Sequence, residues 1–148
     1  MKILPALLLL LAGGIVACDA KPAKPPLEGT WEMTSATWTV EGKEVTAPSA
    51  TISLSQLKMY SKGHFLFVGH FKESDKPARD NYGGGTYTLN GEDYTETILY
   101  HTLAGAVGST LHFKLVVKGS TMTLTGPIVA EEQKSFRSQF TEVYQKDD

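Results

Sequence analysis

Alternating apolar and polar positions are clearest between Gly83 and Tyr100. Side chains that alternate with a period of two lie on one face of a strand. The first run places Tyr87 and Leu89 on one face. The shared face of the second run holds Tyr94, Glu96, Ile98 and Tyr100. Between the runs, Asn90-Gly91 predicts a type I′ turn, which needs positive φ at both central residues. The pattern predicts a β-hairpin, and Gly83-Gly84-Gly85 predicts a bend or bulge in its first strand.

Shorter runs of the same kind lie on both sides of this hairpin. Further strands are expected at 30–40, 45–46, 50–60, 64–71, 110–117, 121–125 and 136–146. A change of parity at Leu57 predicts a break or bulge near Ser55. Loops are expected at 72–82, 102–109 and 126–134, the last with a short helix around Glu131. About eight short strands in hairpin succession predict an all-β fold, either an antiparallel up-and-down barrel or a sandwich.

The N-terminal segment has the features of an export signal. It consists of one lysine, an apolar run from Ile3 to Leu11 and a set of small residues ending at Cys18. The run is too short to span a bilayer, so residues 1–17 are predicted to be a signal peptide. The sequence Ile15-Val16-Ala17-Cys18 resembles a bacterial lipobox, which implies cleavage before Cys18 and attachment of lipid to it. The alternative is an ordinary signal peptide followed by a stray cysteine.

The residues after Cys18 predict how the mature chain is arranged. Residues 18–27 are rich in proline and lysine and predict an extended tether, followed by one domain at 28–146. Because two or more acyl chains give stable anchoring, we expect a lipid-anchored protein of the bacterial cell envelope that faces the periplasm or the exterior. The whole chain has 14 basic and 16 acidic side chains and no basic run, which argues against nucleic acid as a partner.

No sequence motif indicates catalysis, a cofactor or a metal. The chain has no G-x-S-x-G, P-loop or dinucleotide motif. His64 and His70 are six residues apart on one expected strand, about 20 Å, which is too far for a shared metal ion. A haem-binding histidine remains a minor alternative. The adjacent carboxylates Glu131 and Glu132 are expected to be solvated. The sequence therefore predicts a protein that is not an enzyme and has no cofactor.

Glu96 is the most informative polar position. If its face of the strand points into a barrel, an unpaired carboxylate there would be costly, so Glu96 needs a partner or a proton. One interpretation makes it a polar anchor for a ligand, surrounded by aromatic side chains. These expected ligand-binding residues are Glu96, Tyr87, Tyr94, Tyr100 and Phe113. The alternative is a structural hydrogen bond from a tyrosine, a lysine or an arginine.

Several short motifs together resemble a known family. They are Gly29-Thr30-Trp31, Gly63-His64-Phe65, the segment 84–91, Tyr94-Thr95-Glu96 and Glu142-Val143-Tyr144. This set is similar to the lipocalin-like domain of small secreted bacterial lipoproteins, and the similarity covers nearly all of the mature chain. It implies a calycin-type barrel without implying a particular activity.

The resemblance also implies how one end of the barrel closes. In lipocalins the tryptophan of the G-x-W motif plugs that end, and an arginine of the last strand packs on it. The residues here that correspond are Gly29, Trp31 and Lys146, with Arg137 as an alternative to the lysine.

Two functions follow from these predictions. In the first, the anchored barrel binds a small apolar or amphipathic ligand. In the second, the barrel is filled with side chains and acts as a structural or protein-interaction module of the envelope. A small eight-stranded barrel can be full or can hold one small ligand, so an internal cavity distinguishes the two.

Overall fold

Antiparallel pairing of successive strands closes the chain into a barrel. The computed structural model describes residues 27–40, 42–128 and 138–147. Its strands are β1 (Gly29–Val40), β2 (Lys43–Ala47), β3 (Ile52–Ser61), β4 (His64–Glu73), β5 (Arg79–Asn90), β6 (Asp93–His101), β7 (Thr110–Lys118), β8 (Thr121–Ile128) and β9 (Ser138–Lys146). A single 3₁₀ turn, η1 (Ala104–Ala106), lies between β6 and β7. The predicted signal peptide, Cys18, nearly all of the tether and the short helix expected at Glu131 lie outside the described residues.

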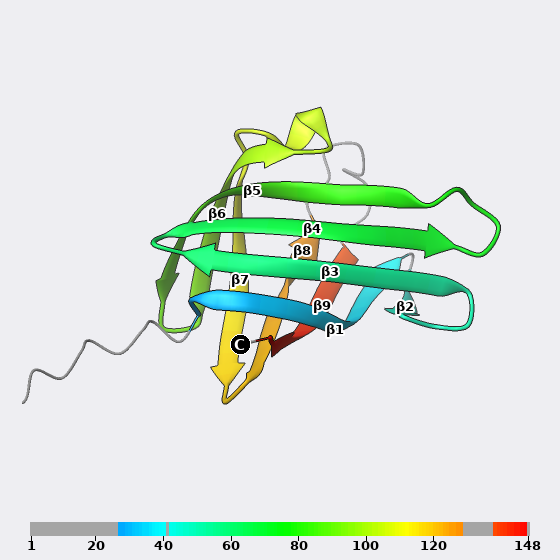
Figure 1. Ribbon diagram of the computed structural model, residues 1–148, viewed down its shortest axis with the longest axis horizontal. Helices are drawn as coiled ribbons and strands as arrows, with labels where there is room; N and C mark the ends of the chain where they lie inside the picture. Colours follow the sequence, from blue (N-terminus) through cyan, green and yellow to red (C-terminus); the bar gives the residue numbers. More distant parts are fainter. Residues whose placement is uncertain (1–26, 41, 129–137, 148) are drawn as a thin grey trace, which may run out of the picture.

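The first and last barrel strands pair with each other. β1 pairs with β9 from Trp31 opposite Lys146 to Trp38 opposite Phe140, and the order of the sheet is β2-β1-β3-β4-β5-β6-β7-β8-β9. β2 is additional to the eight barrel strands, because it pairs only with the second half of β1. Figure 1 shows β3, β4 and β5 in front, with β7, β8 and β9 crossing behind them. The predicted all-β antiparallel barrel of about eight strands is confirmed.

One end of the barrel is filled by a closed aromatic core around Trp31. This side chain is completely buried, and its Nε1–H donates a hydrogen bond to the carbonyl oxygen of Leu27 at 2.9 Å. The ammonium of Lys146 lies 5.3 Å from the centre of the tryptophan ring and donates to the carbonyl oxygen of Glu28 at 2.8 Å. Gly29 has a φ of 124°, which side chains disfavour. Lys146 therefore lies where the resemblance implies a cation, whereas Arg137 is outside the described residues.

β3 differs from the expectation of a bulge near Ser55. Its pairing with β4 is continuous from Ile52 opposite Glu73 to Ser61 opposite His64, so inward and outward side chains alternate without interruption. As a result Lys58 points inward, whereas Leu57 and Met59 point outward and are each 38% exposed. The prediction of a break is wrong, because it required Leu57 and Met59 to face the core.

The central hairpin is confirmed, but its turn differs from the prediction. Asn90 pairs with Asp93, so the two central residues are Gly91 and Glu92. Only Gly91 has a positive φ, 63°, which rules out type I′ and is the pattern of a type II′ turn, with glycine first. The loop before the hairpin is also shorter than predicted, because β4 continues to Glu73 and β5 begins at Arg79.

A β-bulge lies at the three glycines, but its extra residue belongs to β6 and not, as predicted, to the strand that contains the glycines. The register between β5 and β6 shifts there, since Gly84 pairs with Tyr100 but Gly85 pairs with Ile98. A Cβ on Gly85 would overlap the carbonyl oxygen of Thr97, so only glycine fits at this close approach. The extra residue, Leu99, reverses the parity of the strand beyond it. Tyr100 is consequently 68% exposed on the outer surface, and its expected position beside Glu96 is wrong.

The closed end generates the first prediction. Trp31→Ala should lower the free energy of unfolding by about 3–5 kcal/mol, because it removes a fully buried indole and leaves a cavity. Chemical denaturation of the mature domain would measure the change. Trp38→Ala is the matched control, since Trp38 is only partly buried and should cost less. A loss below about 1 kcal/mol for Trp31→Ala would show that the indole does not hold the closed end together.

Candidate functional site

The half of the barrel away from Trp31 contains a cavity of about 700 Å³. Inward side chains of β1, β3, β4, β6, β7, β8 and β9 form its wall, together with residues of β5 and η1 at the mouth. The apolar part of this wall includes Met33, Trp38, Leu54, Phe67, Leu111, Phe113 and Phe140. Ligand cavities in proteins typically measure about 300–1,000 Å³ and are mostly apolar with a few polar groups. The barrel is therefore filled at one end and hollow at the other.

A buried ion pair forms the floor of the cavity. The Nζ of Lys58 on β3 lies 2.5 Å from Oε1 of Glu96 on β6, and the two residues are 4% and 5% exposed. The hydroxyl of Tyr94 donates to the same carboxylate oxygen at 2.7 Å. The ammonium also faces the ring of Phe65 at 5.2 Å. Glu96 thus points inward, and two of the three partner types that the sequence left open, a tyrosine and a lysine, bind it.

The surroundings of Lys58 keep it charged. Burial by itself would lower the pKa of its ammonium, but the nearby carboxylates of Glu96 and Glu142 oppose that effect. The net result is a pKa above the ordinary value of lysine. Burial raises the pKa of Tyr60 to about 12, so this phenol stays neutral. The floor therefore carries one permanent cation next to one directly bound carboxylate.

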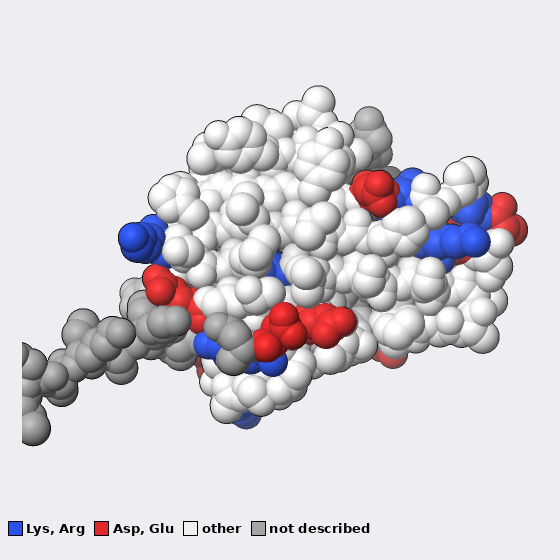
Figure 2. All heavy atoms as spheres, in the orientation of Figure 1, with Lys and Arg blue, Asp and Glu red and all other residues white. Residues whose placement is uncertain are grey.

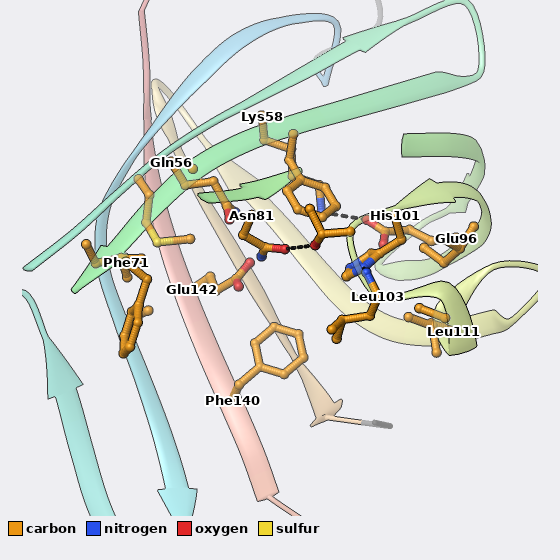
Figure 3. Close-up of a pocket in the computed structure, with 18 of the residues that line it drawn as sticks. Gln56, Lys58, Phe71, Asn81, Glu96, His101, Leu103, Leu111, Phe140 and Glu142 are labelled. Carbon is orange, nitrogen blue, oxygen red and sulfur yellow. Dashed lines mark hydrogen bonds and ion pairs between the residues drawn. The ribbon is translucent and has the colours of Figure 1, made fainter. Parts of the chain in front are cut away.

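A second carboxylate, Glu142 on β9, also lines the cavity. Its Oε2 accepts a hydrogen bond from the hydroxyl of Tyr144 at 2.7 Å, and that hydroxyl accepts one from the amide of Gln56 at 2.7 Å. Burial raises the pKa of Glu142, while Lys58 and the tyrosine hydrogen bond partly oppose the shift. Figure 3 shows Glu142 and Gln56 extending into the pocket from different strands.

Polar side chains also surround the mouth. The backbone N–H of Leu103 donates to Nδ1 of His101 at 2.9 Å, so this nitrogen is an acceptor. Burial lowers the pKa of His101, only partly opposed by Glu96, which favours a neutral imidazole. The hydroxyl of Thr102 donates to Oδ1 of Asn81 at 3.0 Å, which ties the β6–β7 connection to β5 (Figure 3). These contacts hold one side of the mouth in place.

The predicted ligand-binding residues divide into three groups. Glu96 and Phe113 line the cavity. Tyr94 and Tyr87 point inward but belong to the closed end, where the ring of Tyr60 contacts both edge-on. Tyr100 lies outside, for the reason given above. The structure thus brings four of the five predicted residues into the barrel and two of them to the cavity.

Sequence reasoning missed the polar residues of β3 and β9. Gln56 and Lys58 share the inward face of β3 with Tyr60, and Glu142 shares the inward face of β9 with Tyr144. An unbroken period of two through β3 would have placed Gln56 and Lys58 inside. This alternation was hard to recognise in the sequence because the outward residues Leu57 and Met59 are more apolar than their inward neighbours.

The outer wall carries an apolar surface of its own. On β3, β4 and β5 the exposed side chains include Leu57, Met59, Leu66, Val68 and Tyr82. Figure 2 shows few charged side chains in the middle of this face. A shallow groove of about 220 Å³ lies within it. Contiguous apolar surface of this kind often marks an interaction site.

The residues that the structure describes contain no group of three or more side chains placed to hold a metal ion. Within the same ranges, no helix is long and apolar enough to cross a bilayer.

Comparisons with known proteins do not identify a family for this chain. No protein-family model matches the sequence, and no curated protein is similar enough to match it. What the fold and the site define is a class: an eight-stranded antiparallel barrel with an internal cavity, an architecture that fits a lipocalin-like ligand-binding fold.

The ion pair at the floor generates the second prediction. Glu96→Gln should lower the free energy of unfolding by about 3–5 kcal/mol, because it leaves the buried ammonium of Lys58 without its closest partner. Replacing both residues together, Lys58→Met with Glu96→Leu, should recover most of that loss. Chemical denaturation would measure all variants, with exposed Glu44→Gln as the control. A double variant as unstable as the single one would show that the two side chains are not coupled.

Proposed function

We propose that this chain is a membrane-tethered, extracytoplasmic binding protein of the lipocalin-like family that holds a small apolar or amphipathic ligand. The observation that carries the proposal is the cavity of about 700 Å³, with aromatic and aliphatic walls and a polar floor. Binding is favoured over catalysis because the charged groups of the floor bind one another, as in the contact of Lys58 with Glu96. Membership of the family is supported by the packing of Lys146 on Trp31.

The described part of the chain begins at the closed end of the barrel. Leu27 is the first described residue and lies against Trp31 at that end. A lipid on Cys18 would therefore be joined to the barrel at its closed end, and the mouth of the cavity would face away from the point of attachment. This arrangement leaves the ligand free to enter from the aqueous side.

A second candidate function rests on the outer wall of β3, β4 and β5. Its exposed apolar side chains, among them Leu66 and Tyr82, favour a protein-interaction module of the envelope. This function does not need an empty barrel. The test of the cavity given below therefore separates the two candidates.

The tether generates the third prediction. Cys18→Ser should leave the protein unprocessed or mislocalised, because the lipobox-like sequence ends at this cysteine. Detergent-phase partitioning of cell extracts would compare the variant with the wild type. We expect the wild type in the detergent phase and, if the signal is still cleaved elsewhere, the variant in the aqueous phase. Equal release of both proteins into the aqueous phase would contradict lipid attachment.

The cavity generates the fourth prediction. The soluble domain should retain a small molecule that native mass spectrometry detects and solvent extraction recovers. Leu54→Trp should abolish this retention, because Leu54 lines the cavity and a larger side chain would occupy it. Leu57→Trp is the matched control, since Leu57 lies on the same strand but faces outward. Retention that survives Leu54→Trp but fails in Leu57→Trp would place the ligand on the outer wall.

A further inference from the structure

More carboxylates than basic side chains line the cavity, with Asp80, Glu96 and Glu142 against Lys58 and Arg79. At the floor, Lys58 and Glu96 neutralise each other through direct contact, which leaves the carboxylate of Glu142 in excess. His101 does not compensate, because burial lowers its pKa. Nearer the mouth, Nδ1 of His70 lies 2.8 Å from Asp80.

The last charged group of the mouth also has a partner on the protein. The guanidinium of Arg79 lies 4.0 Å from Glu73 and also faces the ring of Phe71 at 5.3 Å. At the exposed mouth, Arg79 shares the carboxylate of Glu73 with Lys76, and Asp80 contacts the imidazole of His70. Inside the barrel the described carboxylates of the cavity are Glu96, which contacts Lys58, and Glu142, which has no cation in direct contact.

The geometry around Glu142 leaves it available to a ligand. Oε2 accepts the hydrogen bond from Tyr144, and within the described residues Oε1 has no hydrogen-bond partner. The Tyr144 hydroxyl is fixed in turn by Gln56, so the carboxylate is held in one orientation. Protein atoms surround Glu142, yet part of its side-chain surface faces the open cavity rather than packed side chains.

We propose that the ligand is an apolar amine whose ammonium group binds the carboxylate of Glu142 while its apolar tail lies against Phe113, Phe140 and Leu111. This inference rests on the proposed ligand-binding function and adds the chemical class of the ligand. An ammonium group supplies a cation in direct contact with Glu142, which no described side chain provides, and a charge-assisted hydrogen bond is stronger than a neutral one.

Other head groups fit this cavity less well. A carboxylate ligand at this depth would lie near Glu96 and Glu142. The cation beside them, Lys58, already contacts Glu96, and Arg79 lies at the exposed mouth. Like charges in a low-dielectric site repel strongly. A neutral alcohol could donate a hydrogen bond to Glu142 but would bring no positive charge to the buried carboxyl group. The cavity should therefore discriminate between molecules that share a tail and differ only in the charge of the head group.

Isothermal titration calorimetry of the delipidated soluble domain with decylamine, decanol and decanoate would test this inference. We expect decylamine to bind about tenfold or more tightly than decanol, and decanoate to bind most weakly. Equal or tighter binding of decanoate would overturn the choice of an amine while leaving a ligand-binding barrel in place. Failure of all three probes to bind would instead count against the proposed function itself.

A substitution at Glu142 tests whether this residue causes the preference for an amine. Glu142→Gln should remove the preference for decylamine over decanol but keep the affinity for decanol within about twofold. Glu32→Gln, on an exposed side chain of β1, is the matched control and should leave the preference unchanged. A preference that persists in Glu142→Gln would overturn the role of this residue. If that variant does not fold, the comparison of the three probes on the wild type still decides the head group.

Discussion

The buried contact between Lys58 and Glu96 marks the level at which the barrel changes from a filled core to a hollow site. It joins β3 to β6 across the interior at 2.5 Å. On the closed side, the rings of Phe65 and Tyr94 face the ammonium. On the other side, the same ion pair lines the cavity. A charged group cannot be covered by apolar side chains alone without a large cost, so the pair limits how far the aromatic core extends toward the mouth.

Such a pair is better understood as a determinant of register than as a source of stability. Burying two charges costs several kcal/mol per ion, which the contact and its hydrogen bonds only roughly offset. A slip of one residue in β3 would turn Lys58 outward and bring Leu57 inward, leaving Glu96 buried without its cation. The pair therefore penalises the alternative pairing that the apolar side chains of β3 would otherwise favour. Continuous pairing with β4 is the observed result.

The sequence predicts the fold well and the site only in part, because the two depend on different signals. Alternation, glycine turns and the G-x-W motif depend on local geometry, and they located the hairpin, the barrel and Trp31. The inward position of Lys58 was missed, since a lysine is expected outside and its neighbours are apolar. Tyr100 was misplaced because the parity rule fails beyond the bulge at Leu99. Both errors arise where long-range pairing overrides a local pattern.

β9 shows how one strand joins the closed end to the site. Its inward side chains at alternate positions are Phe140, Glu142, Tyr144 and Lys146. Lys146 packs on Trp31, Tyr144 is completely buried in the core, and Glu142 faces the cavity. Pairing with β1 on one side and β8 on the other fixes the positions of Phe140, Glu142 and Tyr144, and pairing with β1 fixes that of Lys146. Because a strand paired on both sides holds its side chains more rigidly than a loop does, the packing that closes the barrel also orients the carboxylate that the cavity presents.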